Sequence, residues 1–174
     1  MKKRSPVVFF MAVCLAGFIG QLAAFGQTTT AVYAVDATIS YKVGKTTGSL
    51  GSVSGTAVFL SDGSFSLIGG ATNGLHFAGT YSVAKNGKTA KVTSSKSETA
   101  TMESYIASLI ETDLSGVTAT VKSLKWSKLS LSDGAPVSAT VKGGGKGCEG
   151  KHCKSFTFTV TATYGACQGT CSSL

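Results

Sequence analysis

The chain has 174 residues, with 16 basic and 8 acidic side chains and a net charge of +8. This length fits one domain with a substantial core. The only arginine lies in the basic start of the chain, and proteins that read nucleic acid depend on arginine for phosphate and guanine contacts. The composition therefore argues against a nucleic-acid partner, while abundant Gly, Ser and Thr favour strands and turns over helices.

Residues 1–26 have the pattern of a secretory signal peptide. A basic start at positions 2–4 precedes the apolar run Val7–Gly20, and Ala24 and Gly26 supply the small residues that signal peptidase requires. The apolar run is shorter than the roughly 20 residues that span a bilayer as a helix. We therefore expect cleavage near Gly26 and a secreted or periplasmic product that does not span the membrane; a retained N-terminal anchor is the alternative.

The mature domain, residues 27–174, is predicted to consist mainly of antiparallel strands. The clearest strand is Phe156–Tyr164, where apolar side chains alternate with threonines without a break. A period of two is typical of a strand with one buried face. The same alternation predicts seven further strands, over Tyr33–Val43, Thr56–Leu60, Ser64–Ile68, Leu75–Val83, Thr89–Thr93, Val117–Leu131 and Pro136–Val141.

Several segments interrupt this regular pattern. Gly44–Gly55 is expected to be a flexible connection and Lys142–Lys154 a Gly-rich basic loop. Gly79, in mid-strand, indicates a bulge or a bend. Leu124 and Trp126 have the opposite parity to the rest of the sixth strand, which predicts either a bulge there or a strand covered on both faces.

One helix is predicted between the fifth and sixth strands. Ser95 and Glu98 match a capping box at its start, and Gly116 follows its last turn. Glu103 and Glu111 are left to face solvent. We expect the helix to pack on the sheet through an apolar stripe of Met102, Ile106, Leu109, Ile110 and Leu114.

Three successive turn-and-strand segments resemble the small bacterial lipocalin-like domains, whose hairpins carry the pattern D-G-x-F, G-x-Y and G-K. The matching segments are 62–65, 79–83 and 86–88; the Gly-x-Trp of true lipocalins is absent. The resemblance implies an up-and-down meander that closes into a barrel of about eight strands, and it carries over no functional residue. A membrane barrel is disfavoured, because its lumen is polar and it has no place for the helix.

Four cysteines, Cys148, Cys153, Cys167 and Cys171, remain after processing, and in an exported protein they predict two disulfides. Cys153 and Cys167 flank an extended strand, so at ~3.3 Å per residue they lie roughly 30 Å apart. A disulfide needs Cα atoms within about 7 Å. The local pairs are favoured unless the tail folds back. A zinc site that adds His152 to the cysteines meets the same objection of distance.

The sequence contains no recognisable catalytic constellation. Its only histidines are His76, expected on the exposed face of a strand, and His152. The segment 145–151 fits most of a phosphate-binding loop, but His152 replaces the required Ser or Thr and a strand follows instead of a helix. We therefore predict that the protein is not an enzyme and has no cofactor.

The function that best fits these features is that of an exported binding protein. A closed eight-stranded barrel has room for packed side chains or for one small ligand. We expect a small hydrophobic ligand near the inward-facing residues Tyr41, Phe77, Tyr81, Trp126 and Phe158. The alternatives are an envelope or surface interaction module with a filled core, in which Trp126 is a core residue, and an inhibitor that docks through the 148–153 loop.

Overall fold

The structure, a computed structural model, describes residues 29–69, 75–169, 171, 173 and 174. The predicted signal peptide and its cleavage site lie outside the described residues. The elements within them are β1 (Thr29–Val43), β2 (Thr46–Leu60), β3 (Ser64–Gly69), β4 (Leu75–Val83), β5 (Thr89–Thr93), α2 (Lys96–Asp113), β6 (Thr118–Trp126), β7 (Leu129–Ser132), β8 (Ala135–Glu149) and β9 (His152–Gln168).

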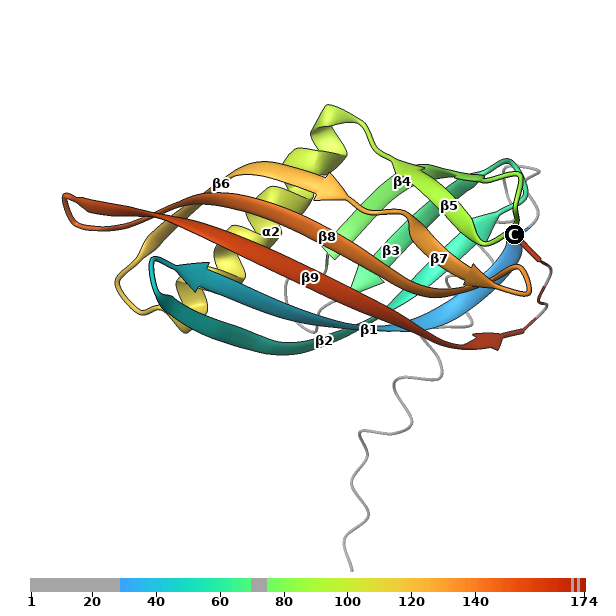
Figure 1. Cartoon of the computed structure of the whole chain (residues 1–174), viewed down its shortest axis with the longest axis horizontal. Coiled ribbons are helices and arrows are strands. Elements are labelled where there is room, and N and C mark those ends of the chain that lie inside the picture. The colour runs from blue at the N-terminus through green and yellow to red at the C-terminus, as the bar shows by residue number, and fades with distance from the viewer. Residues whose placement is uncertain (1–28, 70–74, 170, 172) are drawn as a thin grey trace, which may run out of the picture.

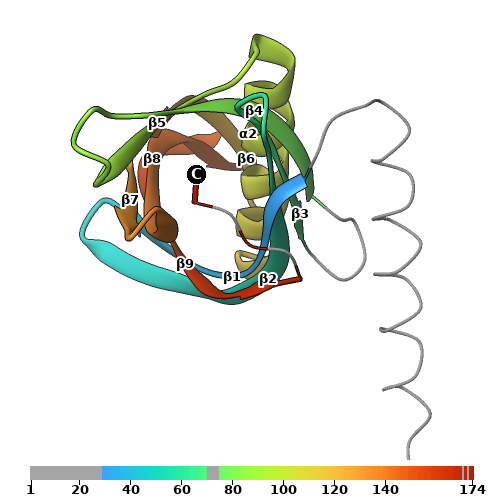
Figure 2. The same ribbon diagram turned by 90° about the vertical axis from the view of Figure 1, so that its right-hand side faces the viewer.

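The strands form a closed antiparallel barrel with eight strand positions, which confirms the predicted fold class (Figures 1 and 2). Strands β1 to β5 pair in sequence order, and β9 pairs with both β1 and β8. β6 and β7 share one position, because β8 pairs with β6 over 141–148 and with β7 over 135–138. The pairing of β7 with β5 closes the ring.

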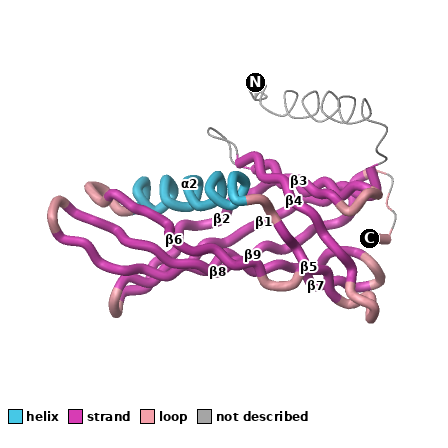
Figure 3. The backbone as a smooth tube through the Cα atoms, turned by 90° about the horizontal axis from the view of Figure 1, so that it is seen from above, coloured by secondary structure: helices cyan, strands magenta, loops and turns pink. Residues whose placement is uncertain are grey.

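The two ends of the barrel are closed differently. We call the end with the β1–β2 and β8–β9 turns the hairpin end, and the opposite end, where β9 runs out, the tail end. β3 pairs with β2 only over 55–59, so within the described residues the outer edge of β2 over 46–54 has no strand partner. At the hairpin end α2 lies against β6 and β4, alongside this gap (Figure 3).

Helix α2 is tied to the strands beside it by two carboxylates. Its N-cap is Ser95, as predicted, and the Ser95 hydroxyl accepts a hydrogen bond from the Glu98 amide. The Glu98 carboxylate accepts from the Ala78 amide of β4 at 2.8 Å, and Glu111 accepts from the Ala119 amide of β6 at 2.7 Å. The prediction that Glu111 faces solvent is therefore wrong. The helical spacing of the sequence shows which side chains are apolar, but it does not show that an amide on a neighbouring strand needs a hydrogen-bond acceptor.

The segment 44–55, predicted to be flexible, is instead almost entirely β2. Its residues pair with β1 up to Thr46, next to the turn at Gly44. The pairing register shifts between Thr38 and Ser40 of β1, and Gly51 opposite has a φ of 76°. This bulge explains why the segment lacks a clean alternation, although the neighbouring strand still orders it.

The predicted basic loop 142–154 is also wrong, because this segment forms the β8–β9 hairpin. Gly143 lies opposite Phe158, and Gly145 lies opposite Phe156. A Cβ atom at either glycine would collide with the facing ring. The glycines therefore make room for aromatic rings from the next strand, and do not mark a flexible connection.

Two other predicted irregularities have different outcomes. Gly79 pairs with Phe65 in regular register, so the predicted bulge is absent there, and the Phe65 ring occupies the space that a side chain at Gly79 would need. The irregularity of the sixth strand is confirmed. Its register with β8 shifts between Val121 and Ser123, and the strand is interrupted after Trp126.

An aromatic cluster fills the tail end of the barrel. Phe59, which is 1% exposed, stacks on Phe65 at 5.8 Å between ring centroids and meets the edges of Tyr33 and Tyr81. The last residue, Leu174, donates from its amide to a carbonyl in the β7–β8 turn at 3.0 Å. Figure 2 shows the C-terminus in the middle of the ring, so the tail covers this end.

Both local disulfides are present, as predicted. Cys148 and Cys153 are cross-strand partners in the β8–β9 hairpin, with Cα atoms 4.0 Å apart. Cys167 and Cys171 join the end of β9 to the tail, with Cα atoms 6.2 Å apart. The first bond therefore joins two strands and does not stiffen a loop.

Candidate ligand site

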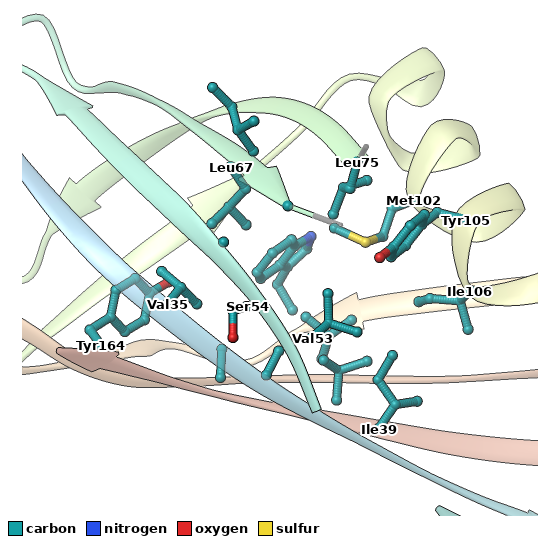
Figure 4. Close-up of a pocket in the computed structure, with 18 residues that line it drawn as sticks. Val35, Ile39, Val53, Ser54, Leu67, Leu75, Met102, Tyr105, Ile106 and Tyr164 are labelled. Atoms are coloured by element: carbon teal, nitrogen blue, oxygen red, sulfur yellow. The ribbon is translucent and has the colours of Figure 1, made fainter. Parts of the chain in front are cut away.

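An apolar cavity of about 80 Å³ lies inside the barrel beside α2. Met102, Tyr105 and Ile106 approach it from the helix, and Leu67 and Leu75 approach it from β3 and β4 (Figure 4). The remaining lining residues come from β1, β2, β3, β6, β8 and β9: Val35, Ala37, Ile39, Val53, Ser54, Gly55, Ile68, Gly69, Trp126, Val141, Val160, Ala162 and Tyr164.

The lining carries no charged side chain, and its polar groups are few. Burial raises the pKa of Tyr164 to about 12 and also raises the pKa of Tyr105, so both hydroxyls are neutral at ordinary pH. The Trp126 Nε1 group is buried and has no hydrogen-bond partner within the described residues. A buried donor without a partner is costly, and Trp126 is one of the residues that line the cavity.

Of the five residues predicted to contact a ligand, Trp126 lines this cavity and Phe77 packs on it, with ring centroids 5.2 Å apart. Tyr81 belongs to the aromatic cluster of the tail end, where its hydroxyl donates to the Leu60 carbonyl at 2.9 Å. The structure thus brings Phe77 and Trp126 together and places Tyr81 elsewhere in the interior.

The remaining two predicted residues, Tyr41 and Phe158, face each other as partners in the β1–β9 pairing. Both are buried, and the Tyr41 hydroxyl donates to Asp113 at the end of α2 at 2.8 Å. Burial raises the pKa of Tyr41, and the hydrogen bond and the negative charge of Asp113 raise it further. This pair forms a layer across the interior, since Ile39 and Val160, two residues on, line the cavity.

A second hollow, of about 450 Å³, lies on the other side of this layer, at the hairpin end. We call it the mouth pocket. Its apolar part consists of Val43, Ile110, Leu114, Val117 and Phe156, and its rim consists of Gly147, Glu149, His152 and Lys154. The rim side chains of Glu149, His152 and Lys154 are exposed, whereas Ile110 and Phe156 are buried.

Sequence reasoning missed most of the cavity. Met102 and Ile106 were expected to pack on the sheet, and their helical spacing was a correct signal for an inward face. Val53 and Ser54 were missed because their segment lacks the alternation that identifies a strand. No feature of the sequence shows that the gap between β2 and α2 lies over a hollow.

In the part of the chain that the structure describes, no three His, Cys, Asp or Glu side chains gather as metal ligands. His76 is exposed on β4, as expected. No helix among the described residues is long and apolar enough to cross a membrane.

Comparison with known proteins yields little. No family model matches the chain, and no curated protein matches it. Among solved structures, the chain is similar to the ywiB protein from Bacillus subtilis, with 9% sequence identity and a TM-score of 0.28. That alignment covers 78% of this chain and 93% of the ywiB chain.

Proposed function

We propose that the protein is an exported, non-catalytic binding protein that holds a small hydrophobic ligand in the apolar cavity beside α2. The observation that carries this proposal is an uncharged hollow lined in part by Trp126, whose buried Nε1 donor has no hydrogen-bond partner among the residues that the structure describes. Ligand pockets are typically apolar with a few placed polar groups. The ligand therefore has an apolar body and one hydrogen-bond acceptor.

The size of the cavity limits the ligand. At about 80 Å³ it is smaller than the apolar cavity of about 150 Å³ that admits benzene in a well-studied case. A compact molecule, or only the apolar end of a longer one, fits. The residues Val53–Gly55 of β2 and Tyr105 of α2 line the side where, among the described residues, β2 has no outer strand partner over 46–54. We therefore propose that the ligand enters between β2 and α2.

Export is part of this proposal. Two disulfides are consistent with an oxidising compartment outside the cytoplasm, and residues 1–26 have the signal-peptide pattern. The lipocalin-like pattern of the 62–88 hairpins adds support, because barrels of this size commonly hold one small ligand.

The test uses Trp126 as the reporter, because it is the only tryptophan. Tetrahydrofuran and cyclopentane are compact rings of five heavy atoms, smaller than benzene and of nearly the same shape, but only tetrahydrofuran, a cyclic ether, has an acceptor oxygen. We expect the ether to bind more tightly and to shift Trp126 emission to longer wavelength. Ala162→Leu, which fills the cavity, should abolish binding, whereas Val137→Leu on the exposed face should not. If neither compound binds the folded protein, the proposal is wrong.

The second candidate is a surface or envelope interaction module with a filled interior. The aromatic cluster at the tail end favours it, because Phe59, Phe65 and Phe77 are at most 4% exposed and contact one another in a chain. The same titration separates the two candidates, since a filled interior predicts no saturable change in Trp126 emission.

A further inference from the structure

The mouth pocket is a second hollow, and the layer formed by Tyr41 and Phe158 separates it from the apolar cavity. Along β9, Phe156 lines the mouth pocket and Val160 lines the cavity, with Phe158 between them. At about 450 Å³ the pocket falls in the size range of small-molecule sites, roughly 300–1,000 Å³. A ligand in the mouth pocket would therefore occupy a site separate from the apolar cavity.

The rim of the mouth pocket carries charged side chains on the inward face of a strand. In β9 the period of two places His152 and Lys154 in the same row as Phe156 and Phe158. Phe156 is the last partner of β1 in this row, so His152 and Lys154 extend beyond the β1–β2 turn. A lysine that serves only to keep the surface soluble is expected on the outward face of a strand. Lys154 lies in the inward row instead, which indicates another role.

The charge around this pocket is predominantly positive. The β8–β9 hairpin carries Lys146, Lys151 and Lys154 against Glu149, and the β1–β2 hairpin adds Lys42 and Lys45. At the end of α2, Asp113 accepts from the Tyr41 hydroxyl and Glu111 from a β6 amide; both carboxylates keep their negative charge, so with Glu149 three acids stand against these five lysines. An anionic group at the rim therefore meets more positive than negative charge.

We propose that the mouth pocket binds an anionic amphiphile, a molecule with one negatively charged head and an apolar tail. The tail lies on Ile110, Leu114 and Phe156, and the head lies at Lys154 and His152 on the rim. Glu149 on the neighbouring strand β8 repels the negatively charged head, and this repulsion restricts the head to the β9 side of the pocket.

The test compares decanoate with 1-decanol, which has the same chain length and no charge, by calorimetry below the concentration at which decanoate forms micelles. We expect decanoate to bind the wild-type protein more tightly. Lys154→Glu should lower the affinity for decanoate about tenfold, since it removes one charge attraction and adds one charge repulsion. It should leave the affinity for 1-decanol unchanged. Leu114→Ala should lower the affinities for both compounds by a similar factor, because it removes part of the apolar lining of the pocket.

The matched control is Lys146→Glu, an identical change of charge on an exposed residue of the same hairpin that does not line the pocket. It should change decanoate affinity less than about twofold. If Lys154→Glu and Lys146→Glu lowered decanoate affinity equally, the effect would reflect only the general positive charge of the hairpin, and the proposal would be overturned. So would equal binding of the acid and the alcohol, or binding to phosphatidylglycerol vesicles without binding to monomeric decanoate. Tetrahydrofuran binding at Trp126 should be unaffected by Lys154→Glu, which separates this site from the cavity.

Discussion

The two ends of the barrel contain similar amounts of strand but are closed by different means. At the tail end eight strands complete the ring, an aromatic cluster around Phe59 fills it, and the C-terminal residues cover it. At the hairpin end the outer edges of β2 over 46–54 and of β6 have no strand partner within the described residues, and α2 takes the place of the missing strands. Both hollows with an apolar lining lie where the helix contributes to the wall.

This difference shows how one barrel can combine a half with a densely packed interior and a half whose interior contains hollows. A strand closes a barrel through a continuous row of backbone hydrogen bonds, which brings neighbouring strands within about 5 Å. A helix makes no such ladder, and here it bonds to the flanking strands through Glu98 and Glu111. Side chains on a helix are also spaced differently from those on a strand, so the interior beside α2 is filled less completely.

The largest effect should come from emptying the packed end. Phe59→Ala removes a ring that contacts four other aromatic rings, and we expect a loss of about 3–5 kcal/mol in the free energy of unfolding. Phe156→Ala, at the mouth pocket, should cost less, about 2–3 kcal/mol, because water already reaches the space beside it. Urea unfolding followed by circular dichroism measures both; equal losses would contradict the distinction between the two ends.

A smaller loss is expected where glycine makes room for an aromatic ring at the hairpin end. Gly143→Ala places a methyl group against the Phe158 ring and the Ser123 carbonyl, so we expect a loss of about 1–3 kcal/mol from overpacking. Gly165→Ala in β9 is the control, since its Cβ would lie 3.6 Å from the nearest atom, an ordinary contact. Equal melting temperatures of the two variants would mean that the ring moves aside without cost.

The helix carboxylates test how the open end is closed. Glu111→Ala leaves the Ala119 amide without its acceptor, and we expect a loss of about 1–2 kcal/mol. Glu111→Gln keeps an acceptor oxygen and should recover part of this loss. Glu103→Ala, on the same helix, should change stability by less than about 0.5 kcal/mol. Hydrogen exchange of the Ala119 amide gives a local measurement, and unchanged protection in Glu111→Ala would refute the role of this carboxylate.

The smallest effect at neutral pH concerns Tyr164, which lies between the aromatic cluster and the cavity. Its pKa is raised by burial to about 12, against about 10 in the unfolded chain. Because the folded protein holds this proton more tightly, its contribution to stability is complete below pH 10 and is lost as the pH rises toward 12. Unfolding midpoints measured across this range should fall less steeply for Tyr164→Phe than for the wild type.

Most of the fold was predictable from local pattern, and the errors have a common cause. The strand Phe156–Tyr164 and the helix with Met102 and Ile106 inward both follow from side-chain period alone. The sequence predicts a flexible connection at 44–55 and a loop at 142–154, because glycine weakens the intrinsic preference for a strand. Residues 46–55 form a strand because they pair with β1, and residues 142–149 form a strand because they pair with β9. In β9 the partners of Gly143 and Gly145 are the large rings of Phe158 and Phe156.

The candidate site was less predictable than the fold. The sequence identified inward-facing aromatic residues, but it does not distinguish a ring that packs against another ring, such as Phe77, from a residue that lines a hollow. That Trp126 Nε1 is buried without a hydrogen-bond partner among the described residues follows only from the three-dimensional placement of the surrounding acceptors.

The amino-acid sequence is sufficient to predict antiparallel strands with one apolar face and one helix that interrupts them, and it favours local pairing of the cysteines. These properties depend on neighbours within a few positions, where period, turn residues and chain reach act directly. The replacement of strands by α2 along one half of the barrel, and the positions of the cavity and the mouth pocket on either side of Tyr41 and Phe158, are seen only in the folded molecule. Those features depend on which distant residues share a volume, and no local pattern records that.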